Sequence, residues 1–103
     1  HGHAVGIGMC AESHVSMKRG LLSKDEFHKL QALLVQTYPF LTFSEDCIRE
    51  IISLMYNDKK NEAGKIFSVL LEAIGKGVYH NELSEKEILE ALQHVSLLAE
   101  SLN

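Results

Sequence analysis

The sequence predicts a mainly α protein: residues 1–103 form a single helical domain of about four helices with one short β-hairpin. Apolar residues recur at helical spacing over most of the chain. Two Ser-x-x-Glu capping sequences precede such stretches, and the single Pro and several Gly stand between them, where helices end. A chain of this kind forms a helical bundle or an orthogonal helical domain.

The first helix is expected over residues 1–19. Its small and apolar side chains stand at helical spacing: Val5, Met9, Ala11, Val15 and Met17. Gly20 follows as a residue that can take the left-handed conformation at a helix end, and Lys18 and Arg19 complement the negative end of the helix dipole.

The second and third helices are marked by caps and by Pro39. Ser23 and Glu26 form a capping box, and Pro39 ends the helix that follows by Tyr38. The apolar face of this second helix is predicted to consist of Phe27, Leu30, Leu33 and Leu34. The third helix begins at 42–45 and runs to about Lys59. Its predicted core stripe consists of Ile48, Ile51, Ile52 and Met55.

Residues 65–74, KIFSVLLEAI, lie between two glycines and have no clean helical period. Periodicity leaves a buried strand and a short helix open for such a run. A turn at 75–77, followed by Val78 and Tyr79, favours a strand and a small hairpin. A second capping box at 84–87 opens the last helix, whose inward residues are expected to be Ile88, Leu89, Leu92, Val95 and Leu98.

Composition excludes several classes of protein. The formal net charge of −4 argues against a nucleic-acid binder, which would carry a basic patch. No run approaches the roughly 20 apolar residues that cross a bilayer, and no signal peptide is visible. Cys10 and Cys47 sit in apolar helical patterns without metal or redox spacing, so both are expected to be buried free thiols in a cytoplasmic protein.

The first helix contains unusual residues for its position. Each Gly in a helix interior costs about 0.8–1 kcal/mol relative to Ala, so Gly2, Gly6 and Gly8 need a compensating reason. Missing side chains allow tight helix–helix packing or close approach of a ligand, and both interpretations stay open.

The histidines do not form a metal site by spacing. His1 and His3 are two residues apart and diverge on a helix, while His14 is about 16 Å further along. The remaining three are isolated and are expected to be exposed or hydrogen-bonded: His28, His80 and His94. Zinc sites need clustered ligands, so a complete site within the chain is not expected.

The stretch HGHAVGIGM resembles the HGxAVxIGM signature of the 3-dehydroquinate synthase family. RGLLS at 19–23, DKK at 58–60 and KIFSVLLEAIGKG at 65–77 follow in the family's order. The similarity therefore extends over essentially the whole chain, as the C-terminal portion of a protein three to four times longer. His3 departs from the pattern, because an acidic residue is frequent there.

The resemblance implies a two-domain enzyme, a phosphate-eliminating lyase of the shikimate pathway. It converts 3-deoxy-D-arabino-heptulosonate 7-phosphate to 3-dehydroquinate, a step in aromatic amino-acid biosynthesis. An N-terminal Rossmann-like domain, absent from this chain, binds NAD, and the intact enzyme is usually a homodimer. His1 corresponds to a zinc ligand that also lies at the substrate, but its partner ligands are upstream. Lys59 or Lys60 would bind the substrate's anionic end. The resemblance places no catalytic or NAD-binding residue within this chain, which alone should be inactive.

Two other functions remain open. The chain could belong to another sugar-phosphate cyclase, such as a 2-deoxy-scyllo-inosose or valiolone-type synthase, although the DKK lysines favour a carboxylate-bearing substrate. It could also be a non-enzymatic interaction module that docks a partner through its first helix.

Overall fold

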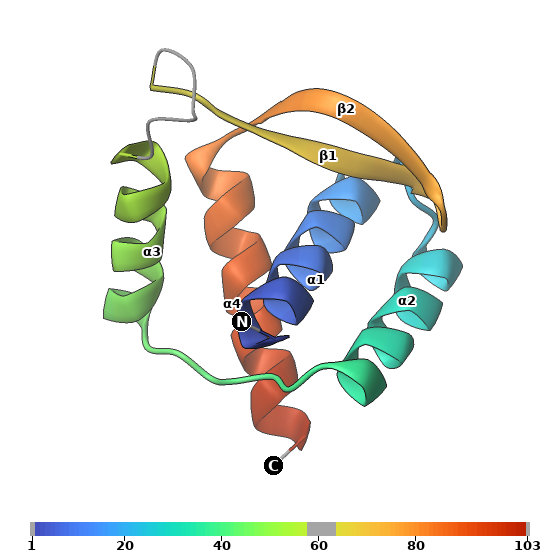
Figure 1. Cartoon of the computed structure of the whole chain (residues 1–103), viewed down its shortest axis with the longest axis horizontal. Helices are drawn as coiled ribbons and strands as arrows, with labels where there is room; N and C mark the ends of the chain where they lie inside the picture. Colours follow the sequence, from blue (N-terminus) through green and yellow to red (C-terminus); the bar gives the residue numbers. More distant parts are fainter. Residues whose placement is uncertain (1, 58–63, 103) are drawn as a thin grey trace.

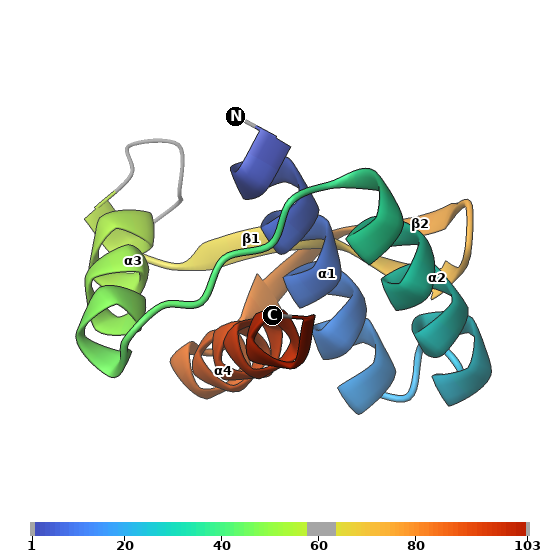
Figure 2. The same ribbon diagram turned by 90° about the horizontal axis from the view of Figure 1, so that it is seen from below.

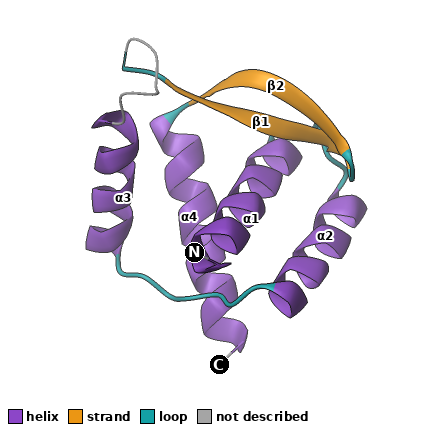
Figure 3. Ribbon diagram, viewed as in Figure 1, coloured by secondary structure: helices purple, strands orange, loops and turns teal. Residues whose placement is uncertain are grey.

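The structure, a computed structural model, describes residues 2–57 and 64–102, and these form four helices and a two-stranded antiparallel sheet (Figures 1 and 3). In chain order the elements are α1 (Gly2–Lys18), α2 (Lys24–Thr37), α3 (Glu45–Asn57), β1 (Ile66–Ala73), β2 (Lys76–Leu83) and α4 (Glu85–Leu102). The predicted mainly α fold with one hairpin is confirmed. No helix in the described ranges combines the length and apolar character needed to span a membrane.

Helix α1 is the centre of the fold. It packs against α4, α2 and β1, so three different elements surround it (Figure 2). Its sequence explains this position, because small and apolar residues occur on every side of the helix rather than on one face. Helix α3 is further out and packs on α4.

Two apolar clusters meet at α1 and α4. The larger joins α1, α3, the hairpin and α4, and its buried members are Val15, Ile48, Ile52, Ile66, Leu70, Leu83, Ile88, Ala91 and Leu92. The smaller consists of Cys10, Leu34 and Val95, from α1, α2 and α4. Most of the predicted inward residues are therefore buried or partly buried. The prediction that Leu33 faces inward is wrong, because its side chain is 57% exposed. Helix α2 packs mainly on α1, so its inward face is narrower than the sequence pattern indicates.

The hairpin resolves the ambiguity at residues 65–74 in favour of a strand. Its turn lies at residues 74–75, where Gly75 has a φ of +86°, so the turn predicted at 75–77 begins one residue earlier. Polar groups of α1 fix the hairpin. The Leu71 amide donates to Ser16 Oγ at 2.9 Å, and the Ser68 hydroxyl donates to the Glu12 carboxylate.

Both predicted capping boxes supply N-caps, but they differ. At α4 the exchange is reciprocal: the Glu87 amide donates to Ser84 Oγ at 3.1 Å, and the Ser84 amide donates to Glu87 Oε1 at 2.9 Å. At α2, Ser23 Oγ accepts from the Glu26 amide, whereas the Glu26 carboxylate accepts from the Ile74 amide in the hairpin turn. The capping box at residues 23–26 thus ties α2 to the hairpin.

Arg19 and Glu87 form a bidentate ion pair between the end of α1 and the start of α4. Arg19 Nε and one Nη donate to the two carboxylate oxygens at 2.6 and 2.9 Å, and the same Nη also donates to the Glu82 carbonyl. The Arg19 hydrogen bond lowers the pKa of Glu87 to about 2. The pair therefore stabilises the fold while Glu87 is charged.

Replacing Glu87→Gln should lower the free energy of unfolding by about 1 kcal/mol at neutral pH, because the ion pair is lost while Gln can still serve in the capping box. A carboxyl whose pKa falls from 4.5 to about 2 on folding stabilises the protein above pH 4.5. The difference between the two proteins should therefore shrink as the pH falls from 4.5 towards 2. Urea unfolding across this range measures it. Glu72→Gln, which removes the more exposed pair with Lys76, is the control and should show a smaller effect.

Gly6 is the glycine that packing requires. A Cβ added there would lie 2.5 Å from Tyr38 Cβ, so α1 passes Tyr38, the C-cap of α2, more closely than any side chain allows. The expectation of tight packing is confirmed at this position, although the neighbour is a cap residue rather than a second helix. A Cβ at Gly8 would meet nothing within 4 Å.

Gly6→Ala and Gly8→Ala should therefore change stability in opposite directions. The first should destabilise by about 1–3 kcal/mol, since Tyr38 must move. The second should stabilise by up to about 1 kcal/mol, since Ala is the better helix former and the site is open. Urea unfolding followed by circular dichroism compares the two, and equal effects would contradict the assigned contact.

The two cysteines do not share one environment. Cys10 is fully buried, as expected, and burial raises the pKa of its thiol to about 11. Cys47 is exposed, which corrects the prediction. It lies in the first turn of α3, one residue before the buried stripe that begins at Ile48, so its side chain points away from the core.

Native protein should consequently react with a disulfide reagent at Cys47 alone. Cys10 is inaccessible, and its raised pKa keeps it in the unreactive thiol form at pH 8. Spectrophotometric titration should find one fast thiol, abolished by Cys47→Ser, and a second only after unfolding. Two fast thiols in native protein would be inconsistent with this packing.

Candidate functional site

The three residues predicted to touch substrate or zinc, His1, Lys59 and Lys60, lie outside the described residues. The side chains of His3 and His80 are also outside the described part. The structure therefore neither brings the predicted site residues together nor separates them. It does describe their neighbours, the first turn of α1 and the last turn of α3.

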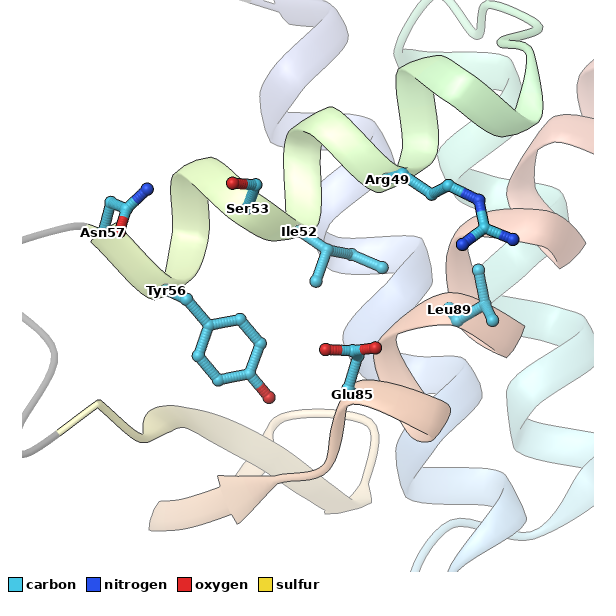
Figure 4. A pocket seen from close by; sticks show the side chains of 7 residues that line it. All are labelled: Arg49, Ile52, Ser53, Tyr56, Asn57, Glu85 and Leu89. Carbon is cyan, nitrogen blue, oxygen red and sulfur yellow. The ribbon is translucent and has the colours of Figure 1, made fainter.

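A cleft of about 370 Å³ lies between α3 and the start of α4 (Figure 4). Its lining residues are Arg49, Ile52, Ser53, Tyr56, Asn57, Glu85 and Leu89. Three polar ones share a face of α3 because they are four residues apart: Arg49, Ser53 and Asn57. In the sequence, Asn57 is the last residue before the segment that carries the predicted lysines.

The apolar floor of the cleft belongs to the core that joins α3 to α4. Ile52 is buried, and Leu89 packs against the same cluster. Ile52 and Arg49 are on adjacent positions of the α3 surface, so the burial of one fixes where the other emerges. The cleft is therefore positioned by the helix pair rather than by a loop.

The cleft contains side chains of opposite charge. Arg49 supplies a permanent cation with five donors, and Glu85 supplies an anionic acceptor. Among the described residues Arg49 makes no ion pair, so its guanidinium is available there. Figure 4 shows the Glu85 carboxylate on the same side of α3 as the Tyr56 ring. Such a set suits a polar ligand that bears hydroxyl and anionic groups.

Sequence reasoning did not find this cleft. The polar face of α3 was available as the i, i+4, i+8 series from Arg49 to Asn57, but such a series is also typical of a solvated helix face. Glu85 was noted only within a capping box. Its place opposite α3 depends on how α4 packs, which the local sequence does not specify.

The described residues do not fit a complete zinc site. In the ranges that the structure covers, no three His, Cys, Asp or Glu side chains lie close enough together to hold a metal ion.

These features define a helical domain with a polar cleft between α3 and α4. The sequence profile described as "3-dehydroquinate synthase C-terminal" matches residues 1–61, more than half of the chain. The chain belongs to this family.

Similar proteins are named 3-dehydroquinate synthase. The chain is similar to the 3-dehydroquinate synthase of Campylobacter jejuni subsp. doylei, with 28% identity over 93 residues, 90% of this chain and 26% of that protein. For the enzyme of Prochlorococcus marinus (strain NATL1A) the identity is 32% over 96 residues, 93% and 26% of the two chains. For that of Pelotomaculum thermopropionicum it is 34% over 93 residues, 89% and 25%. The chain thus spans about a quarter of the length of these relatives.

Proposed function

We propose that this chain is the substrate-side, C-terminal domain of a 3-dehydroquinate synthase. The observation that carries the proposal is the match of a C-terminal profile together with about 90% coverage of the chain by relatives of that name. The full enzyme would convert 3-deoxy-D-arabino-heptulosonate 7-phosphate to 3-dehydroquinate with loss of phosphate. NAD would be bound by a part that precedes this domain, and the assembly would be a homodimer.

Within this proposal the chain binds and orients the substrate. Lys59 or Lys60 supplies a compact cation for its phosphate or carboxylate. The cleft between α3 and α4 offers Arg49, Ser53 and Asn57 to the remaining polar groups. His1 would be one zinc ligand, with the others upstream; bound zinc would polarise substrate oxygens.

A domain exchange tests the proposal. The C-terminal quarter of the Campylobacter jejuni relative is replaced by this chain, and phosphate release and 3-dehydroquinate formation are measured. The exchanged enzyme should turn over, whereas this chain alone should not. NAD binding and a single thermal transition establish that the exchanged protein is folded. A folded, NAD-binding exchange protein without turnover would contradict the proposal.

Two lysine variants then locate the anionic contact. Lys59→Ala or Lys60→Ala in the exchanged enzyme should reduce kcat/KM by about 10–100-fold, the effect of losing a hydrogen bond to a charged group. Lys29→Ala, at an exposed position of α2, is the matched control and should leave it unchanged. If neither lysine variant differs from this control, the segment does not bind substrate.

A further inference from the structure

His14 and His94 form a stacked pair where α1, α2 and α4 meet. Their ring centroids are 4.6 Å apart with an interplanar angle of 26°. Phe27 of α2 packs against both rings, at 5.9 Å from His14 and 5.6 Å from His94. Only 6% of the His14 surface is exposed. His94 is hydrogen-bonded to Gln31 and His28 is exposed, both as expected, but the stacking of His94 on His14 was not predicted.

The ring nitrogens of the two histidines have different surroundings. His94 Nε2 lies 2.7 Å from Gln31 Oε1, and since an amide oxygen only accepts, Nε2 carries the proton. His14 Nδ1 is buried without a partner among the described groups. It belongs to a residue that lines a cavity of about 10 Å³, no more than the space of one water.

Charges on all three helices face the pair. Lys18 of α1 and His28 of α2 disfavour added positive charge, while Glu90 of α4 favours it. Glu87 also lines the small cavity, but its carboxylate is engaged by Arg19. Burial is the largest effect and lowers the pKa of His14 to about 4, and it lowers that of His94 as well.

Of the three helices that surround the histidine pair, α2 has the fewest main packing partners. Its main packing partner is α1, whereas α4 is held by both α1 and α3. Beyond apolar contacts, α2 is tied across the fold by Gln31 to His94 and by Glu26 to the hairpin turn. Any charge placed between α1, α2 and α4 therefore acts first on α2.

We propose that the stacked His14–His94 pair is an acid-sensitive clasp that holds α2 against α1 and α4 when neutral and releases α2 when protonated. Two imidazolium rings at this separation, one of them buried and the other partly buried, repel each other and lose hydration. Release of α2 removes the cover that Leu34 provides to Cys10, so the Cys10 thiol becomes accessible.

The sign and size of the effect follow from linkage. A histidine whose pKa is 6.5 when exposed and about 4 when closed binds its proton better in the open state. The opening equilibrium therefore increases as the pH falls from 6.5 to 4, by up to roughly 300-fold from His14 alone. Above pH 6.5 the clasp should be insensitive to pH.

Cys10 is a built-in probe for the test. In a Cys47→Ser chain, labelling by 4,4′-dithiodipyridine, which reacts in acid, is measured from pH 7 to 4 and divided by the rate of the urea-unfolded chain at each pH. The ratio should rise at least tenfold towards pH 4. His14→Phe and His94→Gln should suppress the rise, whereas His28→Gln, on the exposed side of α2, should retain it.

Hydrogen exchange separates release of α2 from general unfolding. Amides of α2 should lose protection at the pH where Cys10 becomes reactive, while those of α4 and β1 keep theirs. A flat labelling ratio, the same rise in His14→Phe and His94→Gln as in the parent, or loss of protection in α4 and β1 together with α2 would each overturn the clasp.

Discussion

The fold depends on a helix that has almost no solvent-facing side. Helix α1 is enclosed by α2, α4 and β1, and most of its described side chains are buried or partly buried. Where the neighbour approaches most closely, at Tyr38, only glycine fits. This constraint accounts for a sequence that is unfavourable for an isolated helix and is stabilised by the packing around it.

Enclosure also determines how polar atoms on α1 are used. Ser13 and Ser16 are fully buried, and each hydroxyl donates to a carbonyl of its own helix. The Ser16 hydroxyl also accepts a hydrogen bond from the Leu71 amide, so the same buried group orients the hairpin. His14 is the exception, since its buried Nδ1 has no partner in the described part. An unsatisfied buried ring nitrogen is costly, and such groups are often where a fold responds to conditions.

The helix ends could be predicted from short stretches of sequence, because the interactions that form them lie within those stretches. The Ser84 capping box and Gly20 at the end of α1 act on their own backbone, and both are seen as expected. The outcomes that could not be predicted depend on tertiary contacts. The outward Cys47 depends on which face α3 presents, and the stacking of His94 on His14 joins positions far apart in the chain. For the candidate site the sequence predicted the lysine segment but not Arg49 or Glu85, since only helix packing brings these together.

The candidate cleft and the histidine pair lie in different parts of the domain. The cleft is made by α3 and α4, and α4 is anchored to α1 by the core and by the Arg19–Glu87 pair. The histidine clasp lies where α1, α2 and α4 meet, and there α1 is the main packing partner of α2. A change in α2 can therefore alter the junction at Cys10 without separating the helices that carry Arg49 and Glu85. Stability concentrated around α1 and α4 lets one side of the domain hold a binding surface while the other side opens.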